Sequence, residues 1–383
     1  MKLRNIIHNN LIAVAFLAAL LLVACGNDPV MPEQPQEEKL MPISIGGGEQ
    51  ADMSSVTRAG SHPLSDDYKS FKLWGYKTMG IDDANYTDHQ NVMDQYIVQW
   101  TQNTAGSTTT NTSDWEYVGI PNEYAAGTDS EGNPKPQTIK YWDFLATSYR
   151  YFGFAPHDES KVEYGESGNK QPNKDGSGYW WYNISFEADA THPELAPLIS
   201  KLWFANSPKD YGKTVTLEFL KPVTKVRIRL IDAEGKTIDA PQDQGFTDLK
   251  FAPANGDASI VQKGKLRVSY ALTGPATVAN YLPQVEIVGS PVGTVTINKI
   301  DNTYSQWYYV LPHVEQGDYK LTGHISSAQK EATVPKEYMS WFPNMEYTYI
   351  FKMTDHDFQF IDIVQIGVTE WQAENSTHDI YNW

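Results

Sequence analysis

Short segments in which apolar and polar residues alternate recur along the chain, separated by long polar stretches rich in Asn, Gly, Thr and Asp. Residues 71–76, 96–100, 115–118 and 149–154 are the clearest examples in the first half. A period of two is the pattern of a strand with one buried face, and the polar stretches are typical of loops. Aromatic residues make up 13% of the chain and charged residues only 20%, a balance that favours strands over helices. The sequence therefore predicts an all-β fold.

The C-terminal third holds further strand candidates at short spacing. They are residues 260–272 with an internal turn at Lys263-Gly264, and residues 284–288, 293–297, 307–311 and 319–325. Several short strands spaced in this way indicate an antiparallel β-sandwich. Longer strands are expected at 347–353 and 358–371. In the second of these the apolar parity changes after Ile363, which predicts a β-bulge or burial on both faces.

One short covering helix is predicted at residues 193–204, where apolar residues share one helical face and Thr191 precedes the first turn as a cap. Pro197 limits its length. Residues 215–231 then predict one long strand, bent near Pro222, with apolar and charged residues alternating after the bend. One face of this strand should be buried and the other should face water.

The first residues predict export. Lys2 and Arg4 precede an unbroken apolar run at residues 11–24, the pattern of a secretory signal. This run is too short for a membrane-spanning helix, which needs about 20 residues. It ends in Leu-Val-Ala followed by Cys25, which resembles the bacterial lipobox, in which the cysteine is lipidated. Because Cys25 is the only cysteine, a lipid anchor leaves no thiol for disulfides, metal sites or a nucleophile.

Charge limits the partners of the exported chain. Removing residues 1–24 takes two of 30 basic residues and none of 47 acidic ones, so the mature balance is 28 minus 47, or −19. Such a surface repels phosphates and anionic lipids, and we expect no nucleic-acid partner. The expected membrane contact is the lipid on Cys25.

A chain of 383 residues exceeds what one hydrophobic core normally serves, so two domains are expected. The expected division is a lipoprotein signal peptide at 1–24, a flexible tether or cleavable pro-segment at 25–58, an N-terminal β-sandwich at 59–215 and a C-terminal β-sandwich at 216–383. Within the tether, residues 41–45 are apolar enough for a short strand. The alternative to a tether is therefore that part of this segment packs as a first strand.

Several segments, in order along nearly the whole chain, together resemble the fimbrillin family of Bacteroides-type bacteria. The matching segments are the lipobox at Cys25 and residues 55–60, 71–76, 141–144, 151–156, 202–207, 215–219, 223–228, 345–351 and 367–371. The family often has a histidine just after the 215–219 strand, where this chain has Leu220-Lys221-Pro222. That departure indicates a divergent branch.

The resemblance implies two tandem transthyretin-like β-sandwich domains in a fimbrial subunit at the outer membrane and cell surface. In stalk subunits of this family an arginine-specific protease removes the first strand, and a strand of a neighbouring subunit then fills the groove. Arg58 looks like that cleavage position, with Ala59 as the new N-terminus. The implied partners are other fimbrial subunits or a second copy of the chain by donor-strand insertion, and a host or bacterial surface receptor. The donor candidates are residues 361–371 and the tail at 373–383; a mature chain that still begins at Cys25 would instead be an anchor or tip subunit.

Catalytic and cofactor motifs are absent from the sequence, and we expect no enzymatic activity, cofactor or metal site. The nine histidines are scattered, and the densest cluster, residues 354–358, reads as a loop between the last two strands. Abundant acidic residues leave a glycosidase carboxylate pair open, but abundance is not evidence. The competing hypothesis is a surface glycan-binding lipoprotein, with Trp180, Trp181 and Trp307 as candidate glycan contacts because ring faces suit sugar rings. Since Trp180 and Trp181 are adjacent, a strand would point them to opposite faces.

Overall fold

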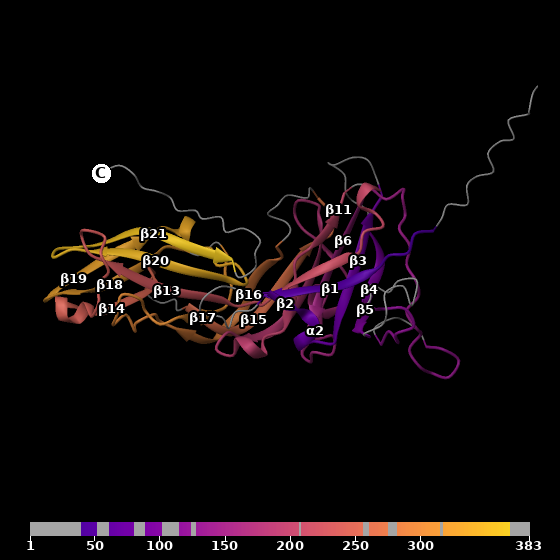
Figure 1. The fold of residues 1–383 in the computed structure, drawn as a ribbon, viewed down its shortest axis with the longest axis horizontal. Coiled ribbons are helices and arrows are strands. Elements are labelled where there is room, and N and C mark those ends of the chain that lie inside the picture. The colour runs from indigo at the N-terminus through magenta and orange to yellow at the C-terminus, as the bar shows by residue number, and fades with distance from the viewer. Residues whose placement is uncertain are drawn as a thin grey trace, which may run out of the picture. The chain divides into compact units, whose positions relative to one another are not determined.

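The computed structural model describes residues 40–51, 61–79, 89–101, 115–123, 128–206, 208–255, 260–274, 282–314 and 317–367. These residues form an almost entirely β structure, which confirms the predicted fold class (Figure 1). Their α-helix is one turn, α2 (Leu64–Asp67). Short 3-10 helices lie in connections: η1 (Glu166–Gly168), η2 (Pro193–Leu195), η3 (Pro208–Asp210), η4 (Pro241–Gln244) and η6 (Lys336–Tyr338).

Within the described ranges the largest sheet has nine strands, in the order β2-β1-β12-β10-β6-β3-β4-β5 with β11 paired to β6. They are β1 (Ile45–Ala51), β2 (Ser61–Pro63), β3 (Ser70–Thr78), β4 (His89–Trp100), β5 (Trp115–Glu116), β6 (Ser148–Ala155), β10 (Leu198–Ser200), β11 (Trp203–Ala205) and β12 (Val215–Leu220). A second sheet has the order β16-β15-β9-β7, with β8 paired to β9. Its strands are β7 (Val162–Tyr164), β8 (Asn173–Lys174), β9 (Trp180–Asp189), β15 (Ile260–Ala271) and β16 (Gln284–Val295).

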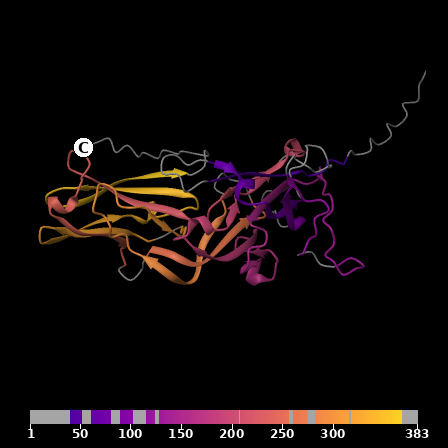
Figure 2. The same cartoon turned by 60° about the horizontal axis from the view of Figure 1, so that its bottom comes forward.

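Two smaller sheets complete the described fold. One has the order β17-β13-β20-β21 and the other β14-β18-β19. Their strands are β13 (Thr224–Ile231), β14 (Phe246–Pro253), β17 (Tyr308–Val310), β18 (Tyr319–Ile325), β19 (Ala328–Val334), β20 (Met345–Met353) and β21 (Phe358–Gly367). Figure 2 shows the yellow strands β20 and β21 in one layer and orange strands in another. Residues of both sheets belong to one hydrophobic core. This pair of sheets is a β-sandwich.

Side chains that alternate along the strands form separate hydrophobic cores on the two faces of the largest sheet. Trp74 and Phe152 from the largest sheet pack with Tyr182 and Tyr270 from the second sheet, and we call this cluster the aromatic core. Phe152 and Tyr270 stack with ring centres 4.1 Å apart. The opposite face of the largest sheet, with residues such as Phe71, buries a separate cluster. The largest sheet is therefore apolar on both faces.

Strands β15 and β16 connect the two expected sequence domains. β15 pairs antiparallel with β9 from Lys263 opposite Asp189 to Ala271 opposite Trp181. Leu266 and Val268 of β15 enter the aromatic core beside residues from before position 215. These contacts therefore join residues from both sides of position 215. A domain boundary near residue 215 remains a proposal.

The predicted helix at 193–204 is wrong. Residues 193–195 form only η2, and the segment continues as the short strands β10 and β11. Leu195 is 75% exposed, whereas the adjacent Leu198 and Ile199 are both fully buried, one in each core that flanks the largest sheet. Pro197 has no backbone N–H to continue a helix, and β6 and β12 supply strand partners on both sides. Tertiary pairing therefore overrides the local periodicity.

Three other strand predictions need correction. The expected long strand 215–231 is two strands in different sheets, because Pro222 cannot donate to a ladder and the chain changes sheet there. The expected turn at Lys263-Gly264 is wrong, since β15 continues through it with a register shift against β16. β16 is likewise one strand across the two segments predicted at 284–297. The β-bulge predicted near Ile363 is confirmed: Ile350 pairs with Asp362 and Phe351 with Phe360, which leaves one extra residue between them.

Lys72 of β3 is a buried cation in this fold. Its side chain is 1% exposed, and Nζ donates a hydrogen bond of 2.7 Å to the Tyr164 hydroxyl. Burial, reinforced by the positive charge of Lys170, lowers the pKa of Lys72 to about 7. The folded protein therefore holds this amine largely uncharged at mildly alkaline pH.

Stability should rise with pH because of Lys72. Between about pH 7 and the unfolded pKa of 10.5 the unfolded chain binds more protons than the folded one, so the free energy of unfolding increases with pH. Lys72→Met is expected to remove this rise, which is at most about 1.4 kcal/mol per pH unit, and to raise stability at neutral pH. Urea unfolding of both proteins between about pH 6.5 and 9 measures the difference. Equal slopes in the two proteins would contradict it.

Candidate functional site

The first described strand, β1, is built into the interior of the largest sheet. It pairs in parallel with β12, with Ile45 opposite Val215, and antiparallel with β2, with Gln50 opposite His62. At and just before its first residue, the apolar Ile43 and Ile45 alternate with the polar Ser44. Part of the segment expected as a tether therefore packs as a first strand, at Ile45–Ala51 rather than at the expected residues 41–45.

Side chains and backbone both anchor the segment that leads into β1. Ile43 and Ile45 are 0% and 1% exposed and belong to the core cluster on the outer side of the largest sheet. The Ile43 N–H donates to the Lys140 carbonyl at 2.8 Å, and its carbonyl accepts from the Tyr117 hydroxyl at 2.9 Å. The Val215 N–H donates to the Ser44 carbonyl at 2.9 Å. Burying each isoleucine contributes about 1.5–3 kcal/mol.

Gly47 allows the closest approach in this site. A Cβ atom added there would lie 2.4 Å from Cε2 of Trp115, far inside van der Waals contact. The indole of Trp115 is itself buried and packs against Phe71 with ring centres 5.2 Å apart. The groove that holds β1 thus has two apolar sockets for isoleucine and one narrow place for glycine.

The candidate processing residues lie outside the described residues. Cys25, Arg58 and Ala59 fall in ranges of which the structure says nothing. Their sequence positions still matter, because β1 ends at Ala51 and β2 begins at Ser61. The peptide bond after Arg58 lies between two strands that pair with each other.

Of the two candidate donor strands, the structure describes one in part and does not describe the other. Residues 361–367 belong to β21, which pairs with β20 along its length, and Ile363 is buried in the core of that sandwich. The tail at 373–383 lies outside the described residues. A donor taken from residues 361–371 would therefore have to leave a sheet of its own subunit.

Trp180 and Trp181 lie on opposite faces of β9. Trp180 packs against the aromatic core, with its ring centre 4.6 Å from that of His89. Trp181 lies on the outer face, where its indole Nε1 donates a hydrogen bond of 2.7 Å to Asp175. Burial alone would raise the pKa of Asp175, but hydrogen bonds from Ser177 and Trp181 hold it below its usual value. Trp181 is therefore the better placed of the two for a ligand.

Trp307 directly precedes β17 and already has a partner. The guanidinium carbon of Arg227 lies 4.2 Å from the ring centre of Trp307 and 4.2 Å from that of Tyr304. Such stacking is a cation–π contact of about 0.5–2 kcal/mol. Since Arg227 covers one ring face, Trp307 offers less surface to a sugar.

The described residues contain few clusters of side chains that could bind a metal or take part in catalysis. In those ranges no group of three or more His, Cys, Asp or Glu side chains is placed to hold a metal ion. Of the cluster at 354–358, residues 354–357 form the predicted loop between β20 and β21, closed by a hydrogen bond of 2.9 Å from the Thr354 N–H to the Asp357 carbonyl, and Phe358 begins β21. None of the described helices is long and apolar enough to cross a membrane.

Fold and site together define an all-β protein whose largest sheet is completed by a segment upstream of a candidate cleavage point. No family model matches the sequence, and no curated protein matches it. Solved structures of similar fold include a Bacteroides uniformis chain named for cell adhesion, with 11% identity and a TM-score of 0.33 over 87% of this chain and 98% of that chain. A fimbrial assembly protein of Parabacteroides distasonis has 8% identity and a TM-score of 0.32 over 83% and 93%. The tip fimbrial protein Mfa3 of Porphyromonas gingivalis, truncated at its C-terminus, has 8% identity and a TM-score of 0.31 over 78% and 94%.

The structural neighbours are thus adhesion and fimbrial proteins, the class that the sequence motifs resemble.

Sequence reasoning missed most of the β1 site. The alternation at residues 41–45 was the available signal, but the strand begins only at Ile45, and the pattern does not identify its partner. A parallel pair with β12 joins residues 170 positions apart, as the Ser44–Thr214 hydroxyl contact of 3.2 Å shows. The role of Gly47 follows only from the position of Trp115.

Proposed function

We propose that the chain is a structural or adhesive subunit of a bacterial surface fimbria, exported as a lipoprotein on Cys25 and processed after Arg58. In this proposal its partners are other fimbrial subunits or further copies of itself, joined by donor-strand insertion. The observation that supports it is the position of β1, a strand that pairs with β12, lies upstream of Arg58 and pairs with β2 downstream of it.

Cleavage after Arg58 would break the covalent connection between β1 and β2, and β1 would then remain only as a bound peptide. Before cleavage β1 is held at high effective concentration by its connection to β2. After cleavage it is held by non-covalent contacts alone, namely its ladder bonds, the hydrogen bonds of Ile43 with Lys140 and Tyr117, and the burial of the two isoleucines, and another strand can compete for the same backbone groups. Strand exchange between identical subunits is a head-to-tail contact and extends into a filament.

The composition of the groove sets what a donor strand must carry. A competitor needs apolar residues two positions apart for the sockets of Ile43 and Ile45, followed two positions later by glycine beneath Trp115. Its backbone must offer the carbonyl that accepts from the Val215 N–H. These requirements give a test by peptide competition.

The first experiment determines the N-terminus and mass of the protein taken from the cell surface. A chain beginning at Ala59 without lipid is expected, and Arg58→Ala should leave the unprocessed form. Arg58→Lys is the matched control, because it keeps the charge and removes only the arginine that an arginine-specific protease requires. A wild-type chain that begins at acylated Cys25 would refute processing and leave an anchor, a tip subunit or a glycan-binding lipoprotein.

A second experiment isolates strand exchange. The purified chain is cleaved after Arg58 and incubated with a labelled peptide of residues 41–51. Uptake of this peptide, and no uptake of the same peptide with Gly47→Val, is the expected result because valine would meet Trp115. Equal uptake of both peptides would contradict a specific groove.

Glycan binding is the second candidate function. The observation that favours it is the outward position of Trp181, whose indole is fixed by Asp175. Trp180 and Trp307 contribute less, because one packs on the core and the other is stacked by Arg227.

A further inference from the structure

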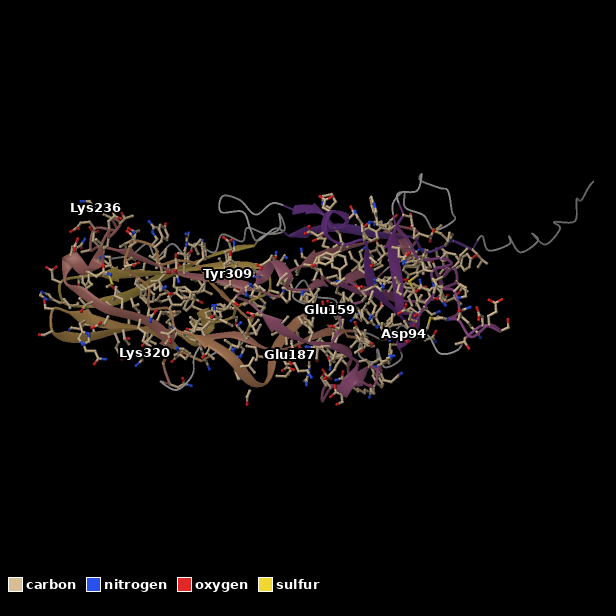
Figure 3. The ribbon with its side chains drawn as sticks, turned by 90° about the horizontal axis from the view of Figure 1, so that it is seen from below. Asp94, Glu159, Glu187, Lys236, Tyr309 and Lys320 are labelled. Atoms are coloured by element: carbon tan, nitrogen blue, oxygen red, sulfur yellow. The ribbon has the colours of Figure 1, made fainter. Side chains whose placement is uncertain are left out.

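The outer face of β9 is polar, although its inner face is part of the aromatic core. Because side chains alternate along a strand, Trp181, Asn183, Ser185 and Glu187 share the outer face. Glu187, labelled in Figure 3, is exposed. Asn183 and Ser185 are only 4% and 8% exposed, so neighbouring elements cover most of their surface.

A pocket of about 440 Å³ opens on this face. Its polar lining residues on β7, η1, β9 and β15 are Glu163, Glu166, Ser167, Asn183, Ser185, Lys265 and Arg267. Val288 and Gly289 of β16 close one side. This volume falls within the range of small-molecule sites, about 300–1,000 Å³.

The charges in the pocket are balanced. Lys265 Nζ lies 2.6 Å from a Glu163 oxygen, and Arg267 Nη1 lies 2.7 Å from a Glu286 oxygen. Each cation keeps further N–H donors beyond its ion pair. An anionic ligand would have to compete with these carboxylates, whereas a neutral ligand can hydrogen-bond to both signs of charge.

The floor of the pocket is pre-organised. Asn183 donates to Glu166 at 2.9 Å and accepts from the Ser269 hydroxyl at 2.8 Å, which fixes its amide. The side chain of Ser185, 8% exposed, also lines the pocket. The floor thus presents one hydroxyl beside a fixed polar network, and the Trp181 ring lies two positions along the same strand face.

We propose that this pocket binds a neutral sugar, as a monosaccharide or the end of a short oligosaccharide. Sugar hydroxyls act as donors and acceptors, and the pocket offers Lys265 and Arg267 as donors with Glu163 and Glu166 as acceptors. The adjacent Trp181 supplies a ring for the apolar face of a second sugar unit. The site gives the glycan-binding candidate defined residues, and it lies apart from β1.

Binding is tested with the purified chain, without its signal peptide, against a panel of glucose, galactose, mannose, N-acetylglucosamine and their β1,4-linked disaccharides. Saturation-transfer NMR and calorimetry are expected to find at least one binder with a dissociation constant on the order of 1 mM, normal for a ligand of this size. Ser185→Val and Lys265→Met should each weaken that affinity about tenfold, since each removes a hydrogen-bonding group.

Lys320→Met is the matched control. The Lys320–Glu331 pair, 2.8 Å apart with side chains 30% and 55% exposed, resembles the Lys265–Glu163 pair at 32% and 52% but lies on β18 and β19. Figure 3 labels Lys320. Its variant should bind like the wild type, and thermal midpoints confirm that all variants fold.

Three results would overturn the proposal: no binder in the panel at about 10 mM, equal affinity in the pocket variants, or displacement of the sugar by inorganic phosphate. The last result would identify an anion site. Measurements before and after cleavage at Arg58 separate this proposal from the fimbrial one, since sugar binding should be the same in both forms.

Discussion

Replacing both Ile43 and Ile45 by alanine is expected to lower the free energy of unfolding by about 4 kcal/mol or more, because each substitution empties a fully buried socket. The two side chains belong to one cluster, so their effects need not add. Ser44→Ala is the matched control on the same segment. It removes only an exposed hydroxyl contact to Thr214 and should cost less than about 1 kcal/mol.

Urea unfolding followed by tryptophan fluorescence measures this change, since Trp115 lies against β1. In the chain cleaved after Arg58, the double variant should also release its N-terminal fragment faster than the wild type does. A double variant as stable as Ser44→Ala would show that β1 adds little to the sheet. The groove would then be a poor candidate for strand exchange.

A chain of residues 40–215 is expected not to fold by itself. Strand β9 would lose its neighbour β15, and the aromatic core would lose Leu266, Val268 and Tyr270. Burial of these three side chains contributes about 1.5–3 kcal/mol each, which together approaches the whole stability of a typical domain, about 5–15 kcal/mol. Circular dichroism in the near ultraviolet should show no fixed aromatic environment.

Substitutions of Tyr270 in the full chain test the same dependence without truncation. Tyr270→Ala removes the ring that stacks on Phe152 and should cost about 3–5 kcal/mol. Tyr270→Phe keeps the ring and loses only the hydrogen bond of 2.8 Å to the Ser200 carbonyl, so about 1 kcal/mol is expected. A cooperatively folded 40–215 fragment would contradict the prediction and favour a domain boundary near residue 215.

Local pattern was enough for strands whose partners lie nearby or whose alternation is clean. β20 and β21 are joined by the short loop at 354–357, and their pairing, loop and bulge all follow from residues close in sequence. β3 and β6 were recognised as strands from their own residues, but the one buried face expected for them is wrong, since both strands are buried on both faces. The fold class followed from many such segments.

The candidate site depended on distant residues and was only partly predictable. The outward direction of one tryptophan of the pair at 180–181 followed from strand geometry. The stacking of Arg227 on Trp307 did not, because the two residues are brought together by the pairing of β13 with β17. The polar pocket beside Trp181 needs four elements and has no sequence signature.

The sequence by itself determined the all-β class, the positions of most strands and the acidic surface, because alternation, composition and charge are properties of neighbouring residues. Tertiary structure alone decided that residues 198–200 form a strand, that the chain changes sheet at Pro222, and that β1 lies between β12 and β2. Each of these outcomes depends on which distant backbone offers hydrogen bonds and which core has room. Local periodicity in the sequence specifies neither the distant hydrogen-bonding partner nor the space available in a core.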